Sequence, residues 1–420
     1  MTSNYLQKFA ISILIAFSSF TTSFSQIKIL FDATKAETAG NADWIIDADT
    51  YNIYWPSSGT YSLTGTESNP QRIPIPAQSG ITSSTTEGYW TGGLSAWGVD
   101  LVKKGYTVET LPYNGLITYN NTSNLQDLKN YKVFIVCEPN ILFTAAQKTA
   151  IMQFVQNGGG LFMVSDHTIS DRNNDGYDSP MIWNDLMTNN TVQANPFGIS
   201  FDIVDFSQTT TNVATLPTDT LLHGPMGNVT KAMWSNGTSM TLNSTINPNV
   251  KGIIYKTGSS TTGTTNVMVA RSRFGAGKVV GIGDSSPCDD GTGDINDVLY
   301  DGWIADASGN HEKLIVNATI WLASSPNTTV INESQVIENN VQVYPNPFSS
   351  SAKLVIDPYV NLENSQLIIC DITGRIVRTM NPDNSNVILI EKDNLKSGIY
   401  SYRLLSKEKI LGKGKFVITE

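Results

Sequence analysis

The sequence predicts an α/β domain with a doubly wound, mostly parallel sheet, followed by a C-terminal all-β sandwich domain. The first observation is that short apolar runs alternate with amphipathic helical patterns from Ile27 to about Ser325. The second is that several of these runs are apolar on both faces, as central parallel strands are. The third is a change after about residue 340, where short strands separated by turn residues follow one another.

Seven runs of the α/β domain are expected to form strands, because each is rich in apolar and β-branched residues and is flanked by turn signals. They are "IKILFDA" (27–33), "YTVETL" (106–111), "YKVFIVCEP" (131–139), "GLFMVSDH" (160–167), "VKGIIYK" (250–256), "NVMVARS" (266–272) and "KVVGIGD" (278–284).

Three segments between these strands predict amphipathic helices. In residues 88–105, Leu94, Trp97 and Leu101 fall on one face. The second helix, within 144–160, opens with a Thr144 and Gln147 capping box and stops at "NGGG". The third helix is expected in the segment "HEKLIVNATIWLAS" (311–324).

Two long segments interrupt the alternation, at about residues 48–87 and 190–248. The first is rich in Ser, Thr, Gly and Pro, and the second in Asn and Thr, which indicates an irregular or β-rich excursion. Long insertions on an α/β scaffold commonly shape a binding rim. Aromatic residues of the first insertion suit either stacking on sugar rings or packing within the loop: Tyr51, Tyr54, Trp55 and Tyr61.

Residues 1–25 have the pattern of a secretory signal peptide, with Lys8, a short apolar core and small residues before Gln26. No later stretch approaches membrane length, so we expect no transmembrane segment. The net charge of −10 and the absence of a basic patch argue against nucleic acid as a partner. Three widely spaced cysteines do not predict a disulfide framework.

Three of the expected strands end in an aspartate: Asp32, Asp166 and Asp284. The carboxyl ends of parallel strands meet at one edge of an open sheet, where ligands bind. Carboxylates gathered in a low-dielectric crevice need a counter-ion, a shared proton or a catalytic use. We therefore predict a functional site at this edge, to which Glu37 and Asp43 of the loop after the first strand could also belong. The alternative is that Asp43 is a helix N-cap and Glu37 is solvated.

Histidine and serine add proton-transfer candidates beside these carboxylates. His167 follows Asp166 directly, and His311 begins the last helix of the domain. Ser165 could act as a nucleophile, although "VSDHT" lacks the glycines of a GxSxG elbow. Either histidine could instead be a surface or hydrogen-bonded structural residue, as is the expectation for His223.

Further acidic residues could hold a divalent metal. In "VVGIGDSSPCDDGTGDINDVLYDGW" (279–303), the aspartates after Asp284 are expected to line or close the site: Asp289, Asp290 and Asp294. The loop "DRNNDGYDS" starts like an EF-type calcium loop, with oxygen ligands around Gly176: Asp171, Asn173, Asp175 and Asp178. Its twelfth position is Ile182 rather than Glu, so a complete EF-hand is excluded, and a plain polar turn is the alternative. No nucleotide cofactor is expected.

The last 80 residues carry "VYPNPF", "DITGRIV", "LKSGIYSYRL" and "GKGKFVIT" in order. This segment resembles the type A C-terminal sorting domain of the type IX secretion system in Bacteroidetes. The resemblance implies a partnership with the type IX machinery, export across the outer membrane and cleavage of the tail. The expected domains are therefore a signal peptide (1–25), an α/β domain (26–325), a linker (326–340) and a sorting domain (341–420).

The α/β domain resembles the class I glutamine amidotransferase-like fold, which is flavodoxin-like, in its ThuA-like branch. The resemblance lies in "LKNYKVFIVCEPNILFTAAQKTAIMQFVQNGGGLFMVSDHT" and "SRFGAGKVVGIGD". It places the nucleophile position at Ser165 or Asp166, and since no cysteine stands there, glutaminase activity is excluded.

The sequence therefore favours a secreted hydrolase that acts on an extracellular polymer or its fragments. Its catalytic candidates are Asp32, Ser165, Asp166, His167, Asp284 and His311. In this hypothesis the carboxylates hold a divalent ion or activate water, and a histidine transfers the proton. The alternatives are a noncatalytic module that binds carbohydrate or calcium at the cell surface, and a structural partner of surface machinery.

Overall fold

The computed structural model describes residues 26–37, 42, 44–46, 77–293, 300–304, 306–324, 341–356, 362, 365–372, 375–382, 385–406 and 409–420. The chain divides into two compact units, residues 1–326 and 327–420, which we call the α/β unit and the β unit. The expected signal peptide, most of the first insertion with its four aromatic residues, and the expected linker lie outside the described residues.

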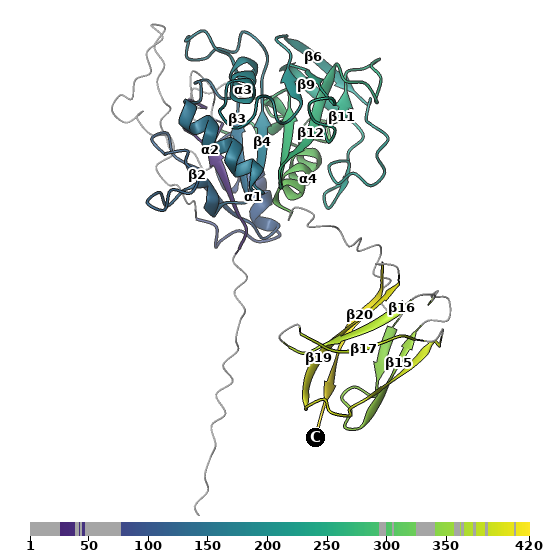
Figure 1. The fold of residues 1–420 in the computed structure, drawn as a ribbon. Coiled ribbons are helices and arrows are strands. Elements are labelled where there is room, and N and C mark those ends of the chain that lie inside the picture. The colour runs from purple at the N-terminus through teal and green to yellow at the C-terminus, as the bar shows by residue number, and fades with distance from the viewer. Residues whose placement is uncertain are drawn as a thin grey trace, which may run out of the picture. The chain divides into compact units, whose positions relative to one another are not determined.

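One half of the central sheet is parallel (Figure 1). Its strands lie in the order β2 (Thr107–Leu111), β1 (Lys28–Asp32), β3 (Val133–Cys137), β4 (Gly160–Val164) and β13 (Gly277–Ile282). Each neighbouring pair is parallel. The carboxyl ends of these five strands therefore share one edge, which is the geometry that the strand-end aspartates require.

The other half of the sheet is antiparallel, so the sheet is mixed. The sequence-based prediction of a mostly parallel sheet is therefore corrected. Strand β12 (Val267–Phe274) pairs antiparallel with β13 and β11 (Lys251–Tyr255), and β10 (Met240–Leu242) pairs antiparallel with β12 and β5 (Ile199–Phe201). Strands β5 and β10 come from the expected insertion at 190–248, which thus extends the sheet.

The same segment also forms strand pairs apart from the central sheet. Strand β6 (Phe206–Thr210) pairs with β9 (Ala232–Gly237), and β7 (His223–Gly224) pairs with β8 (Gly227–Asn228).

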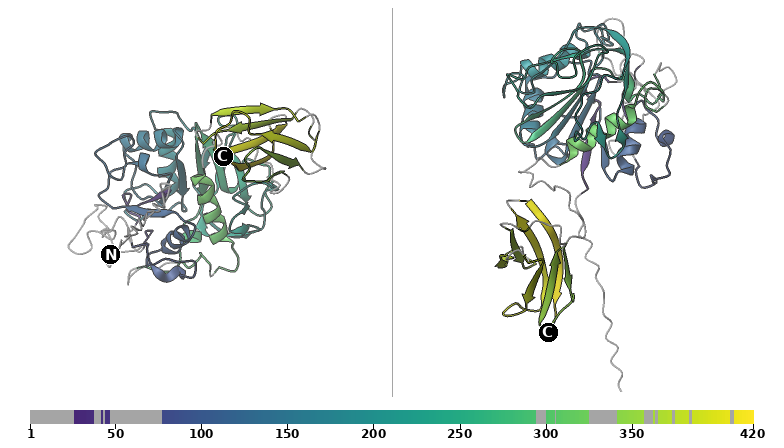
Figure 2. Two further views of the ribbon diagram at one scale, coloured as in Figure 1. Left: turned by 90° about the horizontal axis from the view of Figure 1, so that it is seen from below. Right: turned by 90° about the vertical axis from the view of Figure 1, so that its right-hand side faces the viewer.

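Helices cover both faces of the sheet, as Figures 1 and 2 show. Helices α1 (Ser95–Lys103) and α4 (His311–Ala323) pack into one core, and α2 (Ala145–Gln156) and α3 (Ser179–Thr188) into the other. Helix α2 begins with the expected Thr144 capping box. Helix α3 is not among the helices that the sequence predicts. Its apolar pattern is short and directly follows a polar loop, so the segment has the composition of a loop.

Aromatic packing under the α1 face supports the parallel strands. The buried Trp97 ring of α1 makes edge contacts with Phe31 of β1 and Phe162 of β4, with ring centroids 5.3 Å and 5.0 Å apart, and stacks on Trp303. Replacing a buried aromatic side chain of this size by alanine costs about 3–5 kcal/mol. The strand ends that carry the acidic residues are therefore fixed by a well-packed core.

The described residues of the α/β unit also form three single turns of 3₁₀ helix: η2 (Glu87–Tyr89), η3 (Leu128–Asn130) and η4 (Ser286–Cys288). None of the described helices is long and apolar enough to cross a bilayer. All three cysteines are buried and free.

The β unit consists of two antiparallel sheets, as the sequence predicts. One contains β14 (Val341–Tyr344), β15 (Ser351–Ile356) and β18 (Val387–Glu391); the other contains β17 (Ile376–Met380), β16 (Ser365–Cys370), β19 (Gly398–Ser406) and β20 (Lys409–Ile418). Phe416 stacks on Tyr400 and Tyr402 in the core of the unit.

Candidate functional site

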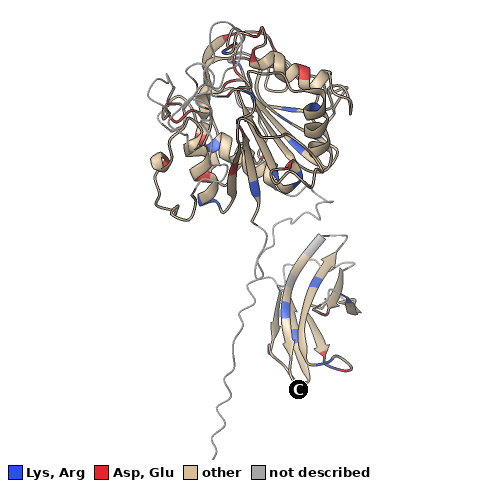
Figure 3. Ribbon diagram, turned by 90° about the vertical axis from the view of Figure 1, so that its left-hand side faces the viewer, with Lys and Arg blue, Asp and Glu red and all other residues tan. Residues whose placement is uncertain are grey.

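Four neighbouring parallel strands end next to an acidic residue. Asp32 ends β1, Glu138 follows β3, Asp166 lies two residues after β4, and Asp284 lies two residues after β13. All four side chains are buried. Figure 3 shows Asp and Glu recurring in the loops along the upper edge of the α/β unit, above these strand ends. We call these four residues the strand-end carboxyls.

Three of these carboxyls influence one another. Burial raises the pKa of Asp166 well above its usual value, and the charges of Glu138 and Asp284 raise it further. Burial also raises the pKa of Asp284 to about 8, with a further contribution from Glu138. Protons are therefore retained at this edge at neutral pH, because the low dielectric disfavours several adjacent negative charges.

Glu138 forms an ion pair with Arg172, which is the only arginine near the strand-end carboxyls among the described residues. Arg172 Nε donates to Glu138 Oε1 at 2.5 Å, and Arg172 Nη2 lies 3.4 Å from Oε2. Ser285 Oγ donates to Oε2 at 2.9 Å. Glu138 has a φ of +45°, a left-handed conformation that is uncommon for a residue other than glycine. Strain of this kind is concentrated at functional sites.

His167 stands beside Asp166 at the more open side of the site. Its Nε2 lies 3.5 Å from Asp166 Oδ2, and its Nδ1 lies 3.8 Å from Asp205 Oδ2. Arg172 Nη2 is 4.0 Å from Asp166 Oδ2. The side chains of His167 and Arg172 are partly exposed, with relative accessibilities of 18% and 25%, so solvent reaches them while Asp166 remains buried.

Asp284 is held by two backbone donors from different segments. Its Oδ1 accepts from Ser286 N at 2.9 Å and its Oδ2 from Ser235 N of β9 at 2.5 Å. These bonds favour the charged form, yet burial outweighs them and the pKa is raised. The 190–248 segment therefore fixes the orientation of a strand-end carboxyl.

Asp32 forms a second acidic pair with Glu37. Thr34 donates to Asp32 through its amide and its hydroxyl, each at 3.2 Å, and Lys35 N donates to Glu37 Oε2 at 2.7 Å. Glu37 Oε1 is buried and accepts from no donor among the described residues. Burial raises the pKa of Asp32 to about 6 and that of Glu37 well above its usual value, and the Asp32 charge adds to the Glu37 shift. Burial of two adjacent carboxyls therefore disfavours the state in which both are charged.

Asn140 joins the loops that carry these residues. Its backbone N donates to Lys35 O at 2.8 Å. In its side chain, Nδ2 donates to Glu138 O at 2.9 Å and Oδ1 accepts from Arg172 N at 3.2 Å. The side chain of Asn173 donates to the Asn140 carbonyl. The loops after β1, β3 and β4 therefore form one buried polar network.

His311 is a structural residue rather than a member of the site. It is buried, its Nδ1 is 2.8 Å from Gly302 O, and its Nε2 accepts from Met233 N at 3.0 Å. Burial lowers its pKa. Both ring nitrogens are thus engaged by backbone groups in the neutral form, so the histidine holds the start of α4. His223 is exposed and pairs with Asn228.

Ser165 is buried and does not form a nucleophile–base pair. Its Oγ donates to the Asp166 carbonyl at 3.2 Å, and no described hydrogen bond joins it to a histidine. Neither Ser165 nor Asp166 has a positive φ, whereas Glu138 does. The positive φ that directly follows a parallel strand therefore lies at Glu138 after β3, not at Ser165 or Asp166 after β4.

Two aspartates of the acidic segment stabilise its loop. Asp289 accepts from Gly291 N at 2.8 Å and from Tyr300 N at 2.6 Å. Asp290 accepts from Ala96 N in the first turn of α1 at 2.7 Å. Burial raises the pKa of Asp289 to about 8 and that of Asp290 to about 6. Asp294 and Asp43 lie outside the described residues.

In the loop after β4, the acidic side chains accept hydrogen bonds from backbone amides of the same loop. Asp171 accepts from Asp175 N at 3.1 Å and Gly176 N at 2.8 Å, while Asp175 accepts from Tyr177 N at 2.9 Å. Asp178 Oδ2 accepts from Ile169 N at 2.8 Å. Among the described residues no three His, Cys, Asp or Glu side chains are placed to hold a metal ion. The calcium site stays a prediction.

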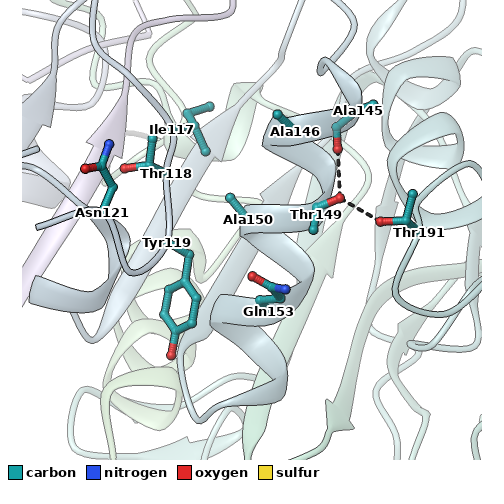
Figure 4. Close-up of a pocket in the computed structure, with 10 residues that line it drawn as sticks. All are labelled: Ile117, Thr118, Tyr119, Asn121, Ala145, Ala146, Thr149, Ala150, Gln153 and Thr191. Carbon is teal, nitrogen blue, oxygen red and sulfur yellow. Dashed lines mark hydrogen bonds between the residues drawn. The ribbon is translucent and has the colours of Figure 1, made fainter.

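A separate hollow of about 520 Å³ lies beside α2 (Figure 4). Its lining includes Ile117, Tyr119, Ala146, Thr149 and Gln153, and none of its lining residues is acidic or histidine. This hollow therefore does not contain the strand-end carboxyls.

Sequence reasoning missed Glu138, Arg172 and Asn140. Glu138 was detectable, because the run "YKVFIVCEP" ends in an acidic residue just as the three aspartate runs do. Arg172 and Asn140 carry no such signal, since they reach the site through loop conformations that no local pattern specifies.

No curated protein matches the chain. Similar solved structures include the mmIFT52 N-terminal domain, at 12% identity and a TM-score of 0.37, covering 71% of this chain and 98% of that one. The cytoplasmic protein STM3548 from Salmonella typhimurium has 13% identity and a TM-score of 0.36, with coverages of 56% and 88%. At these TM-scores neither likeness bears on function.

A third solved structure is similar over a smaller share of the chain. PorZ, an essential surface component of the type IX secretion system of Porphyromonas gingivalis, has 19% identity and a TM-score of 0.15, covering 19% of this chain and 11% of that one. Residues 342–419 match the family model of the secretion system C-terminal sorting domain. The chain thus carries a secretion system C-terminal sorting domain and is exported by type IX secretion to the cell surface or beyond it.

Proposed function

We propose that the exported protein is a hydrolase that uses the strand-end carboxyls of the α/β unit on an extracellular polymer or its fragments. The observation that carries the proposal is the grouping of Glu138, Asp166 and Asp284 at neighbouring strand ends, with burial and mutual charge raising the pKa of Asp166 and Asp284. Buried acids that retain protons near pH 7 are suited to general acid catalysis.

The groups support a division of roles in hydrolysis. Asp284, with a pKa raised to about 8, would donate its proton to the leaving group as the bond breaks. His167 would accept a proton from the attacking water. Its Nε2 is 3.5 Å from Asp166 Oδ2, and Asp166 interacts with Asp284. After turnover the proton that His167 took from water would pass by way of Asp166 back to Asp284, which restores both groups.

Arg172 would position the site rather than transfer protons. Its bonds to Glu138 and to Asn140 connect the loop after β4 with the end of β3. A guanidinium remains charged throughout the working pH range, so it can also stabilise negative charge that develops on the substrate.

We also propose that the α/β unit has a class I amidotransferase-like scaffold without glutaminase chemistry. The left-handed Glu138 directly after β3 supports this proposal, because a nucleophile elbow is a sharp strand-to-helix turn of that kind. Here the turn presents a carboxylate instead of a thiol.

Activity screening of the exported protein tests the proposed reaction. Glycans, esters and phosphoesters would be assayed with and without chelator, using the wild type, Asp166→Asn and Asp284→Asn. Glu87→Gln is the control, since Glu87 pairs with Lys103 away from the strand ends. We expect both aspartate variants to lose at least about 10²-fold in kcat and the control to lose none. Full activity in both aspartate variants would refute the assignment, and loss with chelator alone would assign the chemistry to a metal.

A further inference from the structure

The loop after β4 exposes a strained aliphatic residue next to His167. Ile169 has a φ of +67°, and its side chain is 80% exposed. A β-branched residue in the left-handed region is a genuine conformational outlier. The hydrogen bond from Ile169 N to Asp178 Oδ2, at 2.8 Å, holds this conformation. Folding therefore tolerates both backbone strain and an exposed apolar side chain at one position.

Two further aliphatic residues are exposed beside it. Thr168 N donates to Val204 O at 3.1 Å, which brings the loop after β4 against the segment between β5 and β6. Ile203 and Val204 of that segment are 47% and 38% exposed. The next residue, Asp205, reaches His167. We call Ile169, Ile203 and Val204 the aliphatic rim.

The position and the strain of the rim indicate a ligand rather than a folding role. Contiguous exposed apolar residues mark binding surfaces more often than isolated ones do. Strained residues that contribute nothing to the core are typical of ligand contacts. The rim adjoins His167, so whatever covers it lies at the candidate reaction centre.

We propose that the aliphatic rim binds an aliphatic group of an uncharged substrate, next to the bond that is broken at His167. This inference rests on the proposed hydrolase function and adds the substrate class. The Asp205 carboxyl, whose Oδ2 lies 3.8 Å from His167 Nδ1 and which directly follows Val204, disfavours an anionic substrate at the same place. The aliphatic group would be desolvated against Ile169 and Val204, and its burial would supply binding energy to the reaction.

Binding of the neutral apolar dye Nile red to the exported protein tests the rim directly. We expect Ile169→Asn to weaken binding about tenfold, because the aliphatic contact is lost while asparagine accepts the left-handed backbone. Leu125→Asn is the matched control, since Leu125 is 87% exposed in a different turn. Equal affinity in wild type and Ile169→Asn, absence of dye binding to the wild type, or an equal loss in the control would overturn the proposal.

Thermal unfolding tests the strain. Ile169→Asn and Ile169→Gly should both raise the Tm, by about 2–4 °C, because both residues adopt a positive φ more readily. A lower Tm in both variants would mean that Ile169 stabilises the fold, and the functional reading of its conformation would fail.

Turnover separates this inference from the proposed function. With p-nitrophenyl hexanoate and acetate as probes, Ile169→Asn should raise KM for the hexanoate by about tenfold and leave that for the acetate unchanged. If turnover depends on Asp166 but does not change in Ile169→Asn, the proposed role of the aliphatic rim is refuted and the proposed hydrolase function is not. Nile red binding that depends on Ile169, without turnover of any substrate, would sustain the rim as an aliphatic binding surface and refute the hydrolase.

Discussion

Arg172 Nε lies 2.5 Å from Glu138 Oε1, so a residue of the loop after β4 neutralises a carboxyl at the end of β3. Glu138 is fully buried, whereas Arg172 retains partial exposure. The pair therefore joins the interior of the sheet edge to its open side and fixes the charge balance among the strand-end carboxyls.

Removing one partner of this pair should destabilise the protein. Glu138→Gln leaves the Arg172 guanidinium without its carboxylate, and we expect the free energy of unfolding to fall by about 3 kcal/mol in urea titrations. Arg172→Met and the double variant complete a double-mutant cycle. A sum of single effects equal to the double effect would show that the two side chains do not interact energetically.

Substitution of the buried His311 should reduce stability, whereas substitution of the half-buried His167 should reduce activity. His311→Ala removes an acceptor for Met233 N and a donor to Gly302 O, so we expect a loss of about 2 kcal/mol in stability. His167→Ala should leave the Tm within about 2 °C and reduce kcat by at least about 10²-fold. Retained activity in His167→Ala would remove this histidine from the proposed mechanism.

Stability should decrease as the pH rises from about 4 to about 8. The pKa of Asp284 and that of Asp289 rise from 3.8 to about 8 on folding because of burial. The folded state then binds more protons than the unfolded state between these values, so each group's stabilising contribution is complete below 3.8 and is lost as the pH passes 8.

Thermal unfolding between pH 4.5 and 8.5 measures this dependence. Each group adds a slope of up to about 1.4 kcal/mol per pH unit, and Asp289→Asn should remove one of them. If the Asp289→Asn and wild-type profiles are parallel, Asp289 does not hold a proton in the folded state.

Asp290 should affect stability without affecting chemistry. Its carboxylate accepts from Ala96 N in the first turn of α1 and from Thr292, as a capping residue does. We expect Asp290→Ala to reduce the free energy of unfolding by about 1 kcal/mol. Substrate turnover at a temperature below the transition is the second measurement, and a large loss there would place Asp290 in the reaction.

Much of the secondary structure was accessible from local patterns. The seven expected strands are present, and Thr144 caps α2 as its spacing with Gln147 predicts. The missed helix α3 and the mixed sheet have a common cause: β5, β10 and α3 are short and adjoin polar loops, so their order depends on packing against the sheet.

The candidate site was only partly predictable. Asp32, Asp166 and Asp284 are found at neighbouring strand ends because strand direction follows from the α/β alternation. His311 has the right residue type and place in the chain, yet Gly302 and Met233 occupy both its nitrogens. Such engagement depends on segments far apart in sequence.

By itself, the sequence determined the export route and the alignment of acidic residues with strand ends, because both depend on motifs and periodicities within short stretches. Only the tertiary structure decided that Arg172 pairs with Glu138 and that Asp289 and Asp290 hold a loop. These roles are set by burial and by distances between separate loops, and it is burial that determines whether a carboxyl keeps its proton.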